Sequence, residues 1–282
     1  MRVAVVGHLE WVSFGHVDRV PLAGQIVHAA DAFELPAGGG AVAAVQLAKL
    51  TGACDFFTAV GDDGYGVRSV EELTALGVTV HAAVREAPTR KAVTLIDSGG
   101  ERTITTLGER LEPRASDPLP WDRLDGVDAS YVTAGDPEAF GAARKARVMA
   151  VTSRALAPLA ASRIAADVVV GSARDPAERF EIDTLAEPPG IVVRTKGLAG
   201  GTWEGHGETG RWKGVVEFRD GDPVLEGDAY GAGDTFAAAF TYGLTAGMTI
   251  PDAIALGAKC GAACAAGRGP YEGQLTAVQI GG

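Results

Sequence analysis

The sequence predicts an α/β fold in which helices cover both faces of a parallel sheet, because strand and helix patterns alternate along the chain. The strand patterns are short apolar runs bounded by glycine or turn residues. They are VAVV at 3–6, FFTAV at 56–60, SYVTA at 130–134, DVVVG at 167–171 and IVVRT at 191–195. Helical patterns at 39–52 and 64–77 lie between strands, and each ends at a glycine. We therefore expect a ligand at the carboxyl ends of the strands.

Two stretches, 11–33 and 89–107, interrupt this alternation. Both alternate polar with β-branched residues, and the second contains the turn signal SGGE at 98–101. We expect solvated antiparallel strands that form a small accessory sheet and act as a lid or a dimer contact. Two ordinary surface hairpins are the alternative. We expect residues 1–282 to form one α/β domain with the lid strands inserted in it.

Composition narrows the class of partner. The chain has 282 residues, of which 46% are hydrophobic, so it is long enough to bury a sizeable core. Its net charge of −11 makes nucleic acid an unexpected partner. The chain shows neither a signal peptide nor the roughly 18 consecutive apolar residues of a membrane span. We expect a cytoplasmic protein without a membrane partner, which binds any anion through backbone N–H groups and a few placed cations.

Cysteine and histidine do not predict a metal site. The three cysteines are too few for a disulfide framework, and we expect them to be small core residues. They are Cys54, Cys260 and Cys264. The histidines near the predicted lid are scattered, which favours solvated or hydroxyl-binding roles over metal binding. They are His8, His16 and His28.

The stretch DAYGAGDTFAAAF at 228–240 is the first candidate for chemistry. If the apolar run at 236–244 is helical, residues 231–233 form its first turn, where backbone N–H groups lack intrahelical partners and the helix dipole is positive. The small residues there let an anion approach the backbone. Asp234 beside this anion hole would accept a proton from, or orient, a hydroxyl that attacks phosphorus. The alternative is a helix-capping aspartate.

A second glycine-rich turn follows a strand in VRTKGLAGG at 193–201. Its form, T-x-G-x-x-G, is weak by itself, but with the first motif it indicates two loops that face one phosphate chain. No G-x-x-x-x-G-K-[ST] motif occurs, and the glycine after the first strand lacks a following G-x-x-G. A P-loop enzyme and an ordinary dinucleotide-binding dehydrogenase are therefore disfavoured.

The chain resembles the ribokinase or PfkB family of carbohydrate kinases through five elements that occur in the family's order. They are AGGGAVAAVQLAKLTG at 37–52, TAVGDDGYGVRSVEELTALGV at 58–78, GERT at 100–103, TKGLAGG at 195–201 and DAYGAGDTFAAAF at 228–240. The DxxGAGD element is the specific one. The resemblance implies a Rossmann-like α/β domain with a β-sheet lid, ATP as phosphoryl donor, Mg²⁺, and dimerisation through the lid.

The same resemblance assigns roles to individual residues. Asp234 becomes the catalytic base, beside an anion hole that consists of Gly231, Ala232 and Gly233. The nucleotide site would include Thr195, Gly197, Gly200 and Asp228. The substrate site would include Gly39 and Gly40.

The pocket departs from the family pattern. Ala43 stands where sugar kinases of the family have asparagine, and Val12 stands where they have aspartate. Glu10 would supply a carboxylate to a sugar hydroxyl from a shifted place, or else is a surface or lid carboxylate. These changes put ribose specificity in doubt and leave the GAGD core intact.

Two further features bear on the binding of metal and phosphate. The family's N-x-x-E element is expected near VVGSARDP, and its best match runs from Ser172 to Asp175, which makes Asp175 the candidate metal ligand. Arg90, Lys91 and Arg102 lie on the second lid segment. They would bring positive charge over the site, or else belong to a solvated strand face.

Together these features predict an ATP-dependent kinase that phosphorylates a hydroxyl of a small sugar or nucleoside and closes its lid to exclude water. The alternative is a non-catalytic or weakly catalytic ligand-binding or regulatory protein on the same fold.

Overall fold

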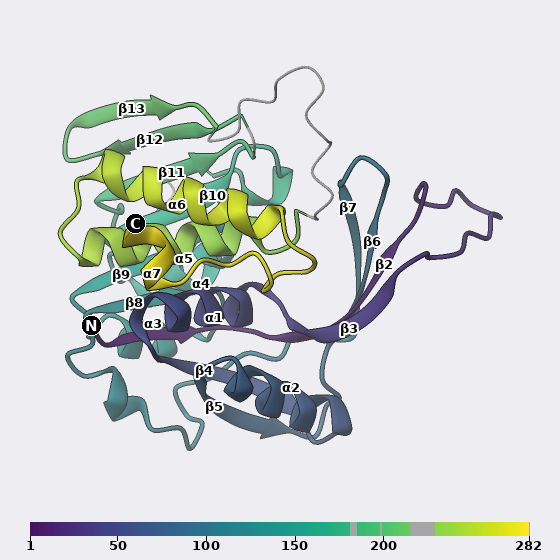
Figure 1. The fold of residues 1–282 in the computed structure, drawn as a ribbon. Coiled ribbons are helices and arrows are strands. Elements are labelled where there is room, and N and C mark those ends of the chain that lie inside the picture. The colour runs from purple at the N-terminus through teal and green to yellow at the C-terminus, as the bar shows by residue number, and fades with distance from the viewer. Residues whose placement is uncertain (181–184, 198, 215–228, 282) are drawn as a thin grey trace.

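The computed structural model describes residues 1–180, 185–197, 199–214 and 229–281. Its main sheet has the strand order β13-β12-β11-β10-β9-β8-β1-β4-β5 (Figure 1). These strands are β1 (Val3–Val6), β4 (Cys54–Gly61), β5 (Val78–Arg85), β8 (Ala129–Val132), β9 (Val148–Thr152), β10 (Val168–Ser172), β11 (Ile191–Thr195), β12 (Gly201–Gly205) and β13 (Glu208–Trp212). All neighbours from β11 to β5 are parallel, whereas β12 and β13 form an antiparallel hairpin at one edge. The predicted parallel sheet is confirmed.

Helices cover both faces of this sheet. They are α1 (Gly39–Thr51), α2 (Gly64–Ala75), α3 (Pro137–Ala143), α4 (Leu156–Ser162), α5 (Ala232–Thr245), α6 (Ile250–Ala265) and α7 (Ala277–Gly281), with short 3₁₀ turns η1 (Trp121–Leu124), η2 (Ser153–Ala155) and η3 (Pro176–Glu178). Strand β1 shows the two faces. Val3 and Val5 pack in the core that contains α1, α5 and α6, whereas Ala4 and Val6 pack in the core that contains α3 and α4.

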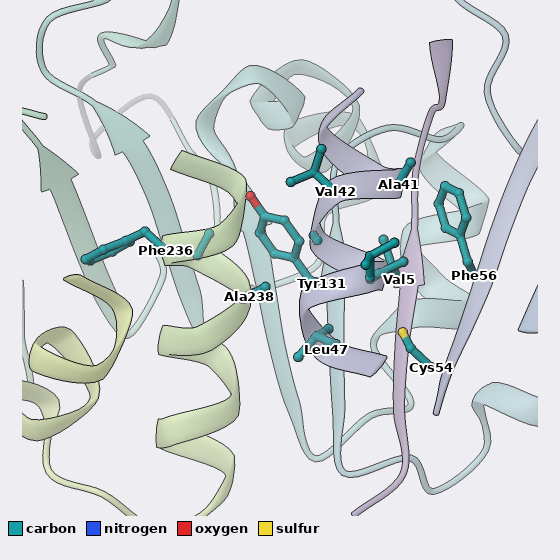
Figure 2. Packing of buried hydrophobic residues seen from close by; sticks show 14 of the residues in the cluster. Val5, Ala41, Val42, Leu47, Cys54, Phe56, Tyr131, Phe236 and Ala238 are labelled. Carbon is teal, nitrogen blue, oxygen red and sulfur yellow. The ribbon is translucent and has the colours of Figure 1, made fainter. Parts of the chain in front are cut away.

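The first of these cores brings α1 and α5 together over the middle of the sheet. Tyr131 of β8 lies between the two helices, near Leu47 of α1 and Ala238 of α5 (Figure 2). Alanines and glycines dominate the facing surfaces of both helices, so the helix axes approach closely. The close approach places the amino-terminal ends of α1 and α5 side by side at the carboxyl ends of the strands (Figure 1).

Local signals explain where the helices begin and end. Helix α1 starts after Gly38 and ends at Gly52, and both glycines have positive φ. Helix α2 starts at Asp63, whose carboxylate accepts a hydrogen bond from the N–H of Gly66. Its last residue is two positions before Gly77, which also has positive φ. Both helices therefore match their predicted ranges closely.

A second sheet projects from the main body, with the order β3-β2-β6-β7 (Figure 1). Its strands are β2 (Glu10–His16), β3 (Ala32–Ala37), β6 (Lys91–Ile96) and β7 (Arg102–Leu107). The expected accessory sheet thus exists, and the turn predicted at 98–101 connects β6 to β7.

Two expectations about this sheet were wrong. The strands are not all antiparallel, because β2 pairs with β6 in parallel. They are also not all solvated: β7 is exposed along its length, but most of β2 is buried. Strand β2 is buried because side chains of α2 and β3 cover it. The Trp11 ring lies 5.4 Å from the Tyr65 ring of α2, and the Phe14 ring stacks at 4.8 Å on Phe33 of β3.

The remaining sequence expectations concern single residues and spans. Cys54, Cys260 and Cys264 are buried core residues, as predicted. His16 lies 3.7 Å from the Asp31 carboxylate. None of the helices in the described ranges is long and apolar enough to span a bilayer.

Candidate active site

Asp234 lies in the first turn of α5, at the place where the sequence predicts the site. A Cβ atom built on Gly39, the first residue of α1, would come within 2.8 Å of the Asp234 Oδ1 atom. The two helix starts therefore meet at the Asp234 carboxylate. Only glycine at position 39 lets the carboxylate come this close to the backbone of α1.

The environment of Asp234 favours its neutral form more than water does. The pKa of this carboxyl is raised to about 6, mainly by burial and in addition by the negative charge of Glu178. Arg102 and Arg154 oppose this effect with their positive charges. A carboxylate with a pKa of about 6 is largely ionised at neutral pH and still accepts a proton readily, as a general base requires.

The predicted anion hole is open to a ligand. Gly231 has φ of 78°, and a Cβ atom there would meet Val42 and Pro270 at 2.9 Å, so this glycine is required by both conformation and packing. A Cβ atom on Gly233 would meet no atom of the described residues within 4 Å. The packing of these residues therefore does not explain a glycine at position 233. Its N–H lies where the helix has no acceptor to offer, and the space beside it is free.

Glu10 faces the same region from the lid side. Its carboxylate is buried and lies 3.2 Å from the Arg90 guanidinium. Burial raises the pKa of Glu10, and the charge of Arg90 lowers it. Gly38 directly follows β3, and a Cβ atom built on it would come within 3.2 Å of the Glu10 N atom. The next residue, Gly39, lies beside the Asp234 carboxylate, so Glu10 and Asp234 lie on either side of the same turn.

Gly40 has a packing role. A Cβ atom there would lie 2.6 Å from the carbonyl oxygen of His8, which follows β1. Burial lowers the pKa of His8 to about 3, together with the charges of nearby arginines, so the imidazole is neutral. A neutral imidazole is suited to hydrogen bonding with hydroxyl groups.

The predicted nucleotide residues lie around a turn after β11. Gly197 and Gly200 have φ of 60° and 90°, and the Lys196 N–H donates to the Gly200 carbonyl at 2.7 Å. Thr195 ends β11. Beside this turn is a hollow of about 490 Å³, lined by Ala173, Arg174, Lys196 and Ala199. Asp228, the other predicted nucleotide residue, lies outside the described residues.

Asp175 is engaged with the protein itself. Its carboxylate pairs with Arg154 and accepts a hydrogen bond from the Ala177 N–H at 2.9 Å, which caps η3. Glu178 lies closer to the centre of the site. It accepts from the Ser172 N–H at 2.7 Å and raises the pKa of Asp234.

Sequence reasoning missed Glu178 because it searched for an acid at the family's spacing. The available signal was an acid in the same loop, six residues after Ser172. Within the residues that the structure describes, no three Asp, Glu, His or Cys side chains gather closely enough to hold a metal ion by themselves.

Two of the three predicted lid cations reach the site. Arg90 pairs with Glu10, and the charge of Arg102 acts on Asp234. Arg102 also donates to the carbonyl of Ala229 at 3.0 Å. Lys91 instead lies 5.2 Å from the centre of the Tyr65 ring, on α2.

Comparison with known proteins gives a family match over most of the chain. The model of the pfkB family of carbohydrate kinases matches residues 2–181 and 212–277. The ATP-dependent ribose-1-phosphate kinase of Halopiger xanaduensis is 29% identical over 286 residues, which cover 95% of this chain and 93% of that protein. Ribokinase of Dictyostelium discoideum is 28% identical over 109 residues, which span 38% of this chain and 34% of that relative.

Solved structures show the same fold. Arabidopsis thaliana ribokinase, complexed with ribose and ATP, has a TM-score of 0.74 at 20% identity, and the match covers 99% of this chain and 97% of that chain. The predicted Rossmann-like, ribokinase-like fold with a small lid sheet is thereby confirmed.

Proposed function

The chain belongs to the pfkB family of carbohydrate kinases, and we propose that it transfers the γ-phosphoryl group of ATP to a hydroxyl of a small sugar or nucleoside. The observation that carries this proposal is the position of Asp234. Its carboxylate has a pKa of about 6 and lies in the first turn of α5, one residue from the open backbone at Gly233. A proton acceptor and an anion site are thus adjacent.

In this reaction Asp234 takes the proton of the acceptor hydroxyl as its oxygen attacks the γ-phosphorus. The new O–P bond forms while the bond between the γ-phosphorus and the β,γ-bridging oxygen breaks, and ADP leaves. The backbone around Gly233 stabilises charge on the transferred group, because N–H groups at a helix start point toward it. Arg102 and Arg154 add positive charge near Asp234.

The nucleotide would lie along the hollow beside Lys196 and Arg174, with its phosphates directed toward Gly233. A Cβ atom on Gly197 would lie 3.2 Å from the Arg174 side chain, which lines the hollow, so glycine at this position leaves room there. Gly200 is required by packing, because a Cβ atom there would clash with the Trp212 backbone. ATP therefore fits the residues present.

Mg²⁺ also fits this site. The ion typically keeps several waters and takes one or two carboxylates besides the phosphates, so a three-ligand protein cluster is not required. Glu178 is the carboxylate we place beside it, because its charge acts on Asp234. Arg154 pairs with both Glu178 and Asp175, but the Asp175 carboxylate also caps η3. When bound, the ion neutralises charge on the β- and γ-phosphates.

We also propose that the protein forms a homodimer through the lid. Apolar side chains on β6 and β7 are exposed, among them Val93, Ile104 and Leu107. An uncovered sheet with an open edge favours pairing with a second copy. Light scattering at micromolar concentration is expected to give twice the mass of the chain, and a monomer would overturn this pairing.

A ligand-binding protein without efficient catalysis is the second candidate. Val12 and Ala43, which replace polar residues of the family pattern, are fully buried and apolar. The pocket therefore has fewer polar groups to fix a neutral sugar. This observation favours binding of a different ligand, or weak turnover.

A screen of sugars, sugar derivatives and nucleosides for ADP release from Mg²⁺-ATP tests the proposed function. We expect release that depends on the acceptor and exceeds the background hydrolysis of ATP. Calorimetric binding of an acceptor without any ADP release would favour the second candidate.

A further inference from the structure

We propose that the acceptor carries an anionic group, a phosphate or a carboxylate, which Arg90 and Arg110 bind beside Glu10. This inference rests on the proposed function and names the substrate class of the same site.

Arg90 is positioned by the backbone of the lid. It precedes β6, and its carbonyl accepts a hydrogen bond from the Trp11 N–H at 2.9 Å. Its side chain is 13% exposed and lies 3.2 Å from Glu10. Its Nε–H is buried and has no acceptor among the described residues. One buried donor on the guanidinium therefore remains available to a ligand.

Arg110 brings a second guanidinium to the same place without a carboxylate of its own. It lies in the loop after β7, and within the described ranges it has no ion pair or side-chain hydrogen bond. Loss of surrounding water lowers the pKa of Arg110, and the neighbouring charge of Arg90 lowers it further. Two like charges close together favour an anion between them.

The two arginines lie near the turn between β1 and β2. The charges of Arg110 and Arg90 both act on the buried His8 imidazole and on Glu10. Glu10 lies beside Gly38, and Gly39, which follows Gly38, lies beside the Asp234 carboxylate. The arginines thus lie on the acceptor side of Asp234.

The other arginine that acts on these residues is already paired. Arg154 contacts both Asp175 and Glu178, whereas Glu10 is the one carboxylate that pairs with Arg90 in the described structure. Burial moreover raises the pKa of Glu10, which weakens its ability to balance two guanidinium groups. The chain as a whole is acidic, with a net charge of −11, so cations gathered at one pocket indicate a local anion.

The chemistry of the guanidinium defines the ligand class. Its planar set of N–H donors matches the paired oxygens of phosphate and carboxylate groups. A neutral sugar would offer no counter-charge to the exposed Arg110 guanidinium, and Glu10 would remain the one carboxylate in the described structure that pairs with either arginine. An acceptor with an anionic group supplies the second negative charge and an acceptor for the buried Arg90 Nε–H.

The first experiment compares matched acceptors by ADP release from Mg²⁺-ATP. The pairs are ribose with ribose 5-phosphate, fructose with fructose 6-phosphate, and glucose with gluconate. We expect kcat/KM to be at least tenfold higher for an anionic member, and the phosphate and carboxylate pairs show which group is preferred. Arg90→Gln and Arg110→Gln should each reduce that value about tenfold or more and reduce the value for the neutral member by a smaller factor. Arg114→Gln is the matched control, since its exposed side chain lies outside this cluster.

Higher activity with the neutral members, or an equal loss on both members in the two variants, would overturn the inference and leave the proposed kinase function standing. If ADP is not released with any acceptor, the proposed function is contradicted. The anion site is then tested separately, by the binding of inorganic phosphate. Calorimetry with inorganic phosphate is then performed on protein saturated with Mg²⁺ and a non-hydrolysable ATP analogue, so that the γ-phosphate position is filled. Binding that Arg90→Gln weakens tenfold supports the anion site, and absence of binding to the wild type overturns it.

Discussion

The two ends of the candidate site differ in the groups that form them, which are mainly backbone at one end and side chains at the other. The transfer end, at Gly39, Gly231, Gly233 and Asp234, consists of backbone at two helix starts and one carboxylate. The acceptor end, at His8, Glu10, Arg90 and Arg110, consists of side chains that the lid and β1 bring together. Backbone binds any phosphate in the same way, whereas side chains distinguish one acceptor from another. A single fold therefore keeps its transfer chemistry while its substrate changes.

The largest effect is expected from Asp234→Asn, which tests whether the transfer end depends on its one carboxylate. The variant keeps size and helix start but removes the proton acceptor, so kcat should fall by about 10²–10⁴-fold. ATP affinity should change little or increase, because a negative charge near the phosphates is lost. Turnover and calorimetry on the same preparation measure both. A fully active variant would show that Asp234 is a helix cap, since Asn caps about as well as Asp.

Gly233→Val tests the claim that the transfer end binds phosphate through backbone. A Cβ atom at this position meets no atom of the described residues within 4 Å, so the fold should persist. Nucleotide affinity should fall by about tenfold or more, because the side chain occupies the space that the phosphate needs. Calorimetry with Mg²⁺-ATP checks this, and circular dichroism checks the fold. Unchanged affinity would place the phosphates elsewhere.

Gly39→Ala tests whether the position of the Asp234 carboxylate matters, because it moves this group without changing its chemistry. The added Cβ would lie 2.8 Å from Asp234 Oδ1, so the carboxylate must shift. A shift of this kind should lower kcat by about tenfold, since misplacement of a reacting group by about 1 Å costs up to about 10²-fold. Gly64→Ala is the control, because it also adds a Cβ at a helix start but meets nothing within 4 Å. Equal activity of the two variants would contradict the close contact.

The smallest effect is expected in the pH profile. The pKa of Asp234 is raised to about 6, so kcat/KM should fall below pH 6 as the base is protonated. Glu178→Gln removes a neighbouring negative charge and should move this acid limb to lower pH. Glu208→Gln, on the exposed strand β13, should leave the limb in place. An acid limb that Glu178→Gln leaves unmoved would contradict the coupling between the two carboxylates.

The raised pKa of Asp234 also makes the stability of the fold depend on pH. Folded Asp234 binds its proton more tightly than the unfolded chain does, so its contribution to stability decreases as pH rises from about 4 to about 6. Asp234→Asn should therefore be more stable than the wild type at pH 7. The gain is at most about 3 kcal/mol for a shift of about two units, and less because the side chain is only half-buried. Thermal unfolding at pH 4 and pH 7 should show the difference shrinking at the lower pH.

Much of the transfer end follows from the sequence, because it depends on residues adjacent in the chain. Three small residues before an apolar run place Gly231 and Asp234 at a helix start, and the structure begins α5 at Ala232. Strands and helices were predicted for the same local reason. Strands β5, β9, β12 and β13 of the main sheet were not predicted. Only some residues of β5, β12 and β13 are buried, so their apolar patterns are weak, whereas β9 is mostly buried and its apolar run was overlooked.

The acceptor end depends on tertiary structure. Glu10 and Arg90 are far apart in the chain and meet because β2 pairs with β6 in parallel, a pairing that no local pattern specifies. Arg110 follows β7, which the antiparallel pairing of β7 with β6 brings to the same end of the sheet. The contact of Gly39 with Asp234 and the approach of Glu178 to the same carboxylate arise in this way too. Local periodicity fixes which face of an element is buried. The order of strands and the packing of helices decide which distant residues become neighbours. The sequence alone therefore determined the fold class and the proposed place of phosphoryl transfer, and only the tertiary structure decided which residues surround the proposed acceptor site.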